Sequence, residues 1–82
     1  MTKRQHLLCL VEAYRRQYGT GPDVSWLTAQ AHRLGLYGHP DMARRASYRL
    51  RSQGFLAPPP GRGGAAVTGL ELTASGQREI AP

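Results

Sequence analysis

The stretch that decides the fold is HPDMARRASYRLRSQGFL, residues 39–56. A helix turns by about 100° per residue, so one over this stretch has two unlike sides. One side carries small and apolar residues, namely Ala43, Ala46, Ser47 and Leu50. The other side is polar and rich in arginine, and carries Asp41, Arg44, Arg45, Tyr48 and Ser52, with Arg49 and Arg51 on its flanks. The small residues would let the helix pack closely on its neighbours, leaving the arginines outward.

The ends of this helix are marked by residues that suit helix termini. Pro40 fits the first turn, where its missing N–H is not needed. Asp41 is favourable near the positive end of the helix dipole. Gly54 fits the position just after a helix, where a left-handed conformation is common. The sequence therefore predicts a helix over about residues 40–53. An ordinary solvated, charged surface helix is the alternative interpretation.

Two further helices are predicted before this stretch. Residues 2–5 have the form of a capping box, and apolar residues then recur at helical spacing until Gly19, which predicts a helix over about residues 3–18. A second helix is predicted over about residues 23–34, with Asp23 or Ser25 as its N-cap and Gly35 after its end. Its expected buried stripe is Val24, Leu27, Ala31 and Leu34.

A hairpin is predicted after the arginine-rich helix. Phe55 to Ala57 indicates a short strand, a glycine-rich tip follows, and Ala65 to Thr73 indicates a returning strand. Thr73 then fits the N-cap of a short helix over about residues 74–80. The expected fold class is α+β and mainly helical, with three helices, a hairpin over about residues 55–73 and a short C-terminal helix. Residues 1–82 are expected to form one domain, because this length leaves no room for a second core.

The charge balance favours a polyanionic partner. Eleven Lys and Arg residues stand against five Asp and Glu residues, which gives a net charge of +6. A strongly basic small domain is typical of proteins that bind nucleic acids. Ten of the eleven cations are arginine and the chain has no asparagine, which indicates a GC-rich genome and weakens arginine content as evidence for base contacts.

Several function classes are disfavoured. Cys9 is the one cysteine and the three histidines are scattered, so no disulfide and no metal site are expected. No apolar run approaches the roughly 20 residues of a membrane span, so we do not expect a membrane location. The expected location is the reducing cytoplasm. The glycine-rich segment at 61–64 lacks the Lys-Ser/Thr of a phosphate-binding loop. We therefore predict no enzyme activity, no cofactor and no small-molecule ligand.

The order of these elements resembles a known family. The segment Arg49 to Leu56 that closes the arginine-rich helix, the glycine-rich hairpin and the run Leu72-Thr73-Ala74-Ser75-Gly76 are together similar to winged helix-turn-helix regulators of the MarR type. The resemblance covers about residues 24–80. It implies a winged helix whose third helix enters the major groove of DNA while the wing tip approaches the minor groove. It also implies that Arg44, Arg45, Tyr48 and Arg49 lie at the major groove and Arg62 lies at the wing tip.

The extra terminal helices with which that family forms dimers and senses ligands are not expected in this chain. A minimal regulator, such as one carried by a phage, a plasmid or a GC-rich bacterium, fits the length. We expect a sequence-specific double-stranded DNA-binding protein, with His39 and Arg51 added to the contact residues. Phosphate contacts are expected from Lys3, Arg15, Arg16 or Arg51.

Three points stay open at the sequence level. Binding as a homodimer on a palindromic site and binding as a monomer are both compatible with the chain. A winged-helix module that binds and modulates a partner protein is an alternative function. An architectural or recombination factor, which would bend DNA and bind it cooperatively, is another.

Overall fold

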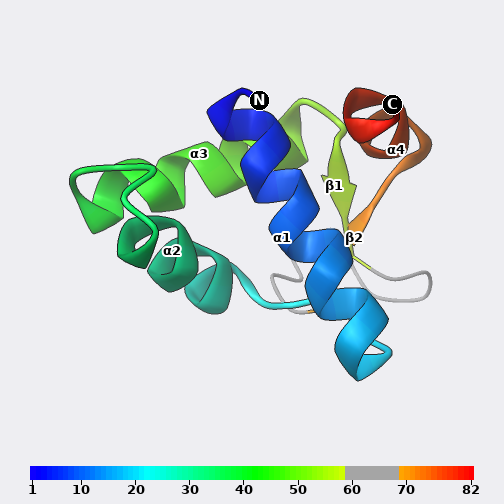
Figure 1. Cartoon of the computed structure of the whole chain (residues 1–82), viewed down its shortest axis with the longest axis horizontal. Helices are drawn as coiled ribbons and strands as arrows, with labels where there is room; N and C mark the ends of the chain where they lie inside the picture. Colours follow the sequence, from blue (N-terminus) through cyan, green and yellow to red (C-terminus); the bar gives the residue numbers. More distant parts are fainter. Residues whose placement is uncertain (59–68) are drawn as a thin grey trace.

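Helix α1 lies at the centre of the molecule and contacts both of its halves (Figure 1). The computed structural model describes residues 1–58 and 69–82, and these ranges contain four helices and one two-stranded antiparallel sheet. The elements in chain order are α1 (Lys3–Tyr18), α2 (Val24–Arg33), α3 (Pro40–Ser52), β1 (Leu56–Ala57), β2 (Glu71–Leu72) and α4 (Ala74–Ile80). Helices α2 and α3 form the most extensive contact, and the sheet and α4 lie on the other side of α1. The prediction of a mainly helical α+β protein is confirmed.

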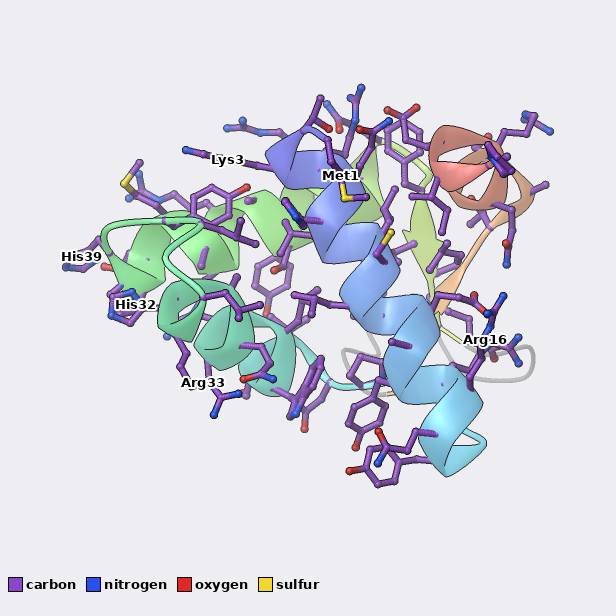
Figure 2. All side chains as sticks on the ribbon, viewed as in Figure 1. Met1, Lys3, Arg16, His32, Arg33 and His39 are labelled. Atoms are coloured by element: carbon purple, nitrogen blue, oxygen red, sulfur yellow. The ribbon has the colours of Figure 1, made fainter. Side chains whose placement is uncertain are left out.

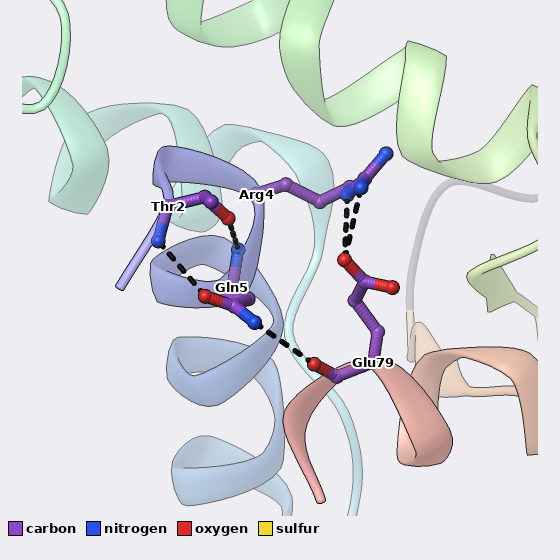
Figure 3. Close-up of polar contacts among 4 residues, drawn as sticks. All are labelled: Thr2, Arg4, Gln5 and Glu79. Carbon is purple, nitrogen blue, oxygen red and sulfur yellow. Dashed lines mark hydrogen bonds and ion pairs between the residues drawn. The ribbon is translucent and has the colours of Figure 1, made fainter.

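The start of α1 has the capping box that its sequence predicts. The Thr2 hydroxyl accepts a hydrogen bond from the Gln5 N–H at 3.1 Å, and the Gln5 side chain accepts one from the Thr2 N–H at 2.9 Å (Figure 3). These two bonds satisfy N–H groups that otherwise have no partner at a helix start. The helix ends at Gly19, whose φ of 78° is left-handed. Both ends of α1 are therefore set by local sequence.

Asp23, one of the two candidate N-caps, caps helix α2. Its carboxylate accepts a hydrogen bond from the Trp26 N–H at 2.7 Å. The prediction that Leu34 is buried is wrong, since this side chain is 54 % exposed. The helix ends at Arg33, and the chain reverses at Gly35, whose φ is 75°. The Leu36 N–H then bonds to the carbonyl of α2 residue Ala31, and Leu36 takes the place against the core.

The predicted inner side of α3 is buried. Ala43, Ser47 and Leu50 are at most 3 % exposed, and the Ser47 hydroxyl donates to the Ala43 carbonyl at 2.9 Å. Ala46 is half-buried at the edge of this side. These residues pack on α1 and α2, with a core formed by Leu7, Leu8, Val11, Leu27, Ala31, Ala43, Leu50 and Leu56. One whole side of α3 therefore faces the protein.

The strands are shorter than the sequence predicts. Leu56 pairs with Leu72 and Ala57 pairs with Glu71. Phe55 is not part of β1, because its N–H bonds to the Leu50 carbonyl and completes the end of α3. The expected tip of the hairpin and the first part of its returning strand, residues 59–68, lie outside the described residues.

Residues Leu70 to Ile80 are tied to distant parts of the chain. The Leu70 N–H donates to the Pro22 carbonyl at 2.9 Å, so the segment before β2 lies along the linker between α1 and α2. Thr73 caps α4, as predicted. Helix α4 is fixed to the start of α1 by Glu79, which pairs with Arg4 and accepts through its carbonyl from Gln5 at 3.2 Å (Figure 3).

Candidate nucleic-acid interface

Carboxylates on α1 and α4 form ion pairs with arginines of α1. Glu79 lies 2.9 Å from Arg4. Glu12 lies 3.2 Å from Arg15 and 3.1 Å from Arg16. Arg15 and Arg16 were expected to contact phosphates, but in the structure both are engaged by one buried carboxylate. Their contribution to a polyanion-binding surface is therefore reduced.

Glu12 is only 7 % exposed and remains an ionised partner at neutral pH. Burial raises the pKa of its carboxyl, but the hydrogen bond from Arg16 and the charge of Arg15 outweigh that effect. Gln77 of α4 adds a further hydrogen bond at 3.3 Å. The net result is a pKa below the ordinary value for Glu. This carboxylate therefore partly neutralises Arg15 and Arg16 of α1 and also binds α4 through Gln77.

The outward side of α3 keeps its positive charge. Arg45 and Arg49 are exposed, and neither forms an ion pair within residues 1–58 and 69–82. Arg44 lies 3.7 Å from Asp41, but both side chains are about 60 % exposed, and exposed pairs of this kind are weak. The arginines of α3 are thus more available to an external anion than those of α1.

His39 is the N-cap of α3, a role that its sequence position did not reveal. Its Nδ1 accepts a hydrogen bond from the Asp41 N–H at 3.1 Å. The side chain is 66 % exposed at the start of α3, the helix that carries the arginines with which it was expected to act.

Helix α3 stands between hollows on its two sides. The larger one, about 800 Å³, lies between α2 and α3 and is lined by His32, Arg33, Arg44 and Tyr48 among others. On the side of α1, two smaller hollows of about 210 and 230 Å³ share Tyr37, Ala46 and Arg49. We call these two together the Tyr37 hollow. The outward side of α3 is therefore a ridge, which is the shape that enters a groove.

The start of α1 contributes a cation beside the Tyr37 hollow. The Lys3 ammonium lies 5.1 Å from the ring centroid of Tyr37, within the range of a cation–π contact. Burial raises the pKa of the Tyr37 hydroxyl, and the nearby charge of Arg49 opposes that rise. Lys3 lies on the same side of the molecule as His32, Arg33 and His39, whereas Arg16 lies on the opposite side (Figure 2). No local pattern in the sequence could have placed Lys3 beside Tyr37.

Most of the contact residues expected from the sequence come together in the structure. Arg44, Arg45, Tyr48 and Arg49 are all exposed along α3, with Tyr48 44 % exposed. Arg51 is half-buried at the edge of this set. Arg62 was expected at the hairpin tip and lies outside the described residues.

In residues 1–58 and 69–82, no three His, Cys, Asp or Glu side chains come close enough together to hold a metal ion. No helix of the described chain combines the length and apolar character needed to cross a membrane. No protein-family model matches the sequence, and no curated protein or solved structure shows significant similarity to it.

Proposed function

We propose that this protein is a winged helix-turn-helix protein that binds double-stranded DNA in a sequence-specific manner and regulates transcription. Helix α3 would act as the recognition helix in the major groove, and the hairpin after β1 would approach the minor groove. The packing of α2 on α3 and the antiparallel strand pair that follows support this fold assignment, although the turn over residues 34–39 is longer than the roughly three or four residues typical of the motif. A non-enzymatic role in the cytoplasm, with no cofactor, is part of the same proposal.

One observation carries the proposal: the outward side of α3 is a ridge with three exposed arginines and little opposing charge. An α-helix fits the major groove, which is about 12 Å wide. An arginine there can donate two hydrogen bonds to the O6 and N7 atoms of guanine, which contributes about 1–3 kcal/mol of discrimination. Arg45 is the best candidate, because it lies near the middle of the outward side and has no ion pair with a described residue.

The test is selection of bound duplexes from a random pool, followed by titration of Arg45→Ala. We expect one enriched sequence, and a loss of about 1–3 kcal/mol in affinity for it that relaxes the preference at one base pair. Arg78→Ala is the matched control, because Arg78 is an exposed arginine on α4. A palindromic consensus would indicate a homodimer, and a single half-site would indicate a monomer. Equal discrimination by Arg45→Ala and the unsubstituted protein would show that Arg45 does not read a base.

A second function, the binding of a partner protein, is favoured by exposed apolar side chains in the α2–α3 turn and the first turn of α3. Leu34 and Met42 are each 54 % exposed, and exposed apolar residues are common at protein–protein contacts. A partner-binding winged helix would enrich no DNA sequence in the selection. An architectural or recombination factor would instead bend DNA and bind it cooperatively without one discrete site.

A further inference from the structure

The Tyr37 hollow gathers basic side chains from two parts of the chain that are far apart in sequence. Lys3, in the first turn of α1, lies over the ring of Tyr37, which lines both parts of the hollow, and Arg45 and Arg49 of α3 line the hollow directly. Arg49 lines both parts of the hollow, and Gln53 adds an amide to one of them. The hollow is therefore formed by the tertiary fold, and it adjoins the outward ridge of α3, with which it shares Arg45 and Arg49.

The hollow carries an excess of positive charge. Among the residues that the structure describes, no Asp or Glu side chain lines either part of it. Arg4, which lines one part, is already paired with Glu79 at 2.9 Å. Lys3 and Arg49 form no ion pair within the part of the chain that the structure describes. Positive charges held close together without a carboxylate between them favour the binding of an external anion. The hydroxyl of Tyr37 offers a neutral hydrogen-bond donor beside them.

We propose that the Tyr37 hollow binds a backbone phosphodiester of the DNA strand that borders the major groove occupied by α3. This inference rests on the function proposed above and adds a positioning contact to it. A helix in the groove has a phosphate backbone on each side, and contacts to that backbone fix the register of the protein without reading sequence. Lys3 and Arg49 supply the charge, and Tyr37 supplies a hydrogen bond. The start of α1 thereby becomes part of the DNA-binding surface.

The first experiment measures the salt dependence of binding to a selected duplex and to a duplex of mixed sequence. The variants are Lys3→Gln and Tyr37→Phe, and Arg78→Gln is the control that removes the same charge from exposed α4. Each phosphate contact adds about 0.9 to the slope of log K against log salt. Lys3→Gln should lower the slope by about that amount, which is a factor of about 3.5 between 50 and 200 mM salt. It should weaken binding equally for both duplexes.

Tyr37→Phe keeps the ring that packs against the core, so it should fold normally and lose affinity with little change of slope. A slope for Lys3→Gln equal to that of Arg78→Gln would overturn the hollow as a phosphate site while leaving the proposed function intact. Absence of binding by the unsubstituted protein to any duplex would overturn both proposals. These outcomes separate the two inferences.

The second experiment locates the phosphate. Neutral methylphosphonates replace single phosphates along the selected duplex, and each duplex is titrated with the unsubstituted protein and with Lys3→Gln. At one position the neutral group should weaken DNA binding by the unsubstituted protein severalfold. It should not weaken binding by Lys3→Gln any further, because the two changes remove the same contact. That position should lie on a strand flanking the bases read by α3. Additive losses at every position would overturn the assignment of Lys3 to a phosphate.

Discussion

Gly21→Ala is the substitution for which the structure gives the sharpest expectation. A Cβ at this position would lie 1.7 Å from the Leu70 carbonyl oxygen and 2.6 Å from its carbon. Both are backbone atoms, so no side-chain rotation relieves the overlap. The α1–α2 linker and the segment before β2 would have to move apart. That movement breaks the hydrogen bond from the Leu70 N–H to the Pro22 carbonyl.

The cost of Gly21→Ala can be estimated from these two effects. Overpacking a closely fitted site costs about 1–3 kcal/mol, and the hydrogen bond contributes about 0.5–1.5 kcal/mol. A loss of about 2–4 kcal/mol is large beside the roughly 4–12 kcal/mol expected for a domain of this length. Each kcal/mol shifts the Tm of such a domain by about 4–8 °C. We therefore expect Gly21→Ala to lower the Tm by at least about 8 °C.

Thermal and urea unfolding followed by far-ultraviolet circular dichroism measure this loss. Gly38→Ala is the matched control, because a Cβ there meets nothing within 4 Å and the residue is outside the left-handed region. That variant should stay within about 0.5 kcal/mol of the unsubstituted protein. Equal stability of the two alanine variants would refute the close approach of Gly21 to Leu70.

Two further substitutions test the charge arrangement. Glu12→Gln should lower the free energy of unfolding by about 1–2 kcal/mol at neutral pH in urea titrations. The pKa of Glu12 in the folded state lies below its ordinary value, so its stabilisation is fully present at a pH above the ordinary pKa and is lost as the pH falls through the folded-state pKa. The stabilities of Glu12→Gln and of the unsubstituted protein should therefore converge in strong acid. Asp41→Asn removes the one carboxylate on α3, so in titrations at low salt it should bind duplexes of mixed sequence severalfold more tightly. Unchanged binding would place Asp41 away from the phosphates.

The helix boundaries could be predicted because each depends on a few neighbouring residues. Thr2 and Gln5 cap α1 through one another, and Asp23 and Gly54 act at α2 and α3 in the same local way. Leu34 shows where such reasoning ends. Its position fits the helical period of α2, but the helix has already stopped there, and the fold uses Leu36 instead. Helical periodicity predicts which side chains are buried only for residues that lie within the helix.

The outward arginines of α3 could also be predicted, because the helical period alone separates them from the buried side. The pairing of Glu12 with Arg16 follows the i,i+4 spacing and was detectable in the sequence. The pairing of Arg4 with Glu79 was not, because 75 residues separate them. The approach of Lys3 to Tyr37 likewise depends on how α1 crosses the helix pair.

The contacts that hold α4 in place also determine where the positive charge remains. Glu12 and Glu79 fasten α4 to α1, and in doing so they neutralise arginines on that side of the molecule. Among the described residues, Arg4, Arg15 and Arg16 of α1 are paired with these carboxylates, whereas Lys3 of α1 and Arg45 and Arg49 of α3 form no ion pair, so the positive charge is unevenly distributed. An uneven field orients a charged partner before contact and raises the rate of productive encounter, increasingly so at low salt. If the protein binds DNA as proposed, fold stability and the direction from which the DNA approaches depend on the same two carboxylates.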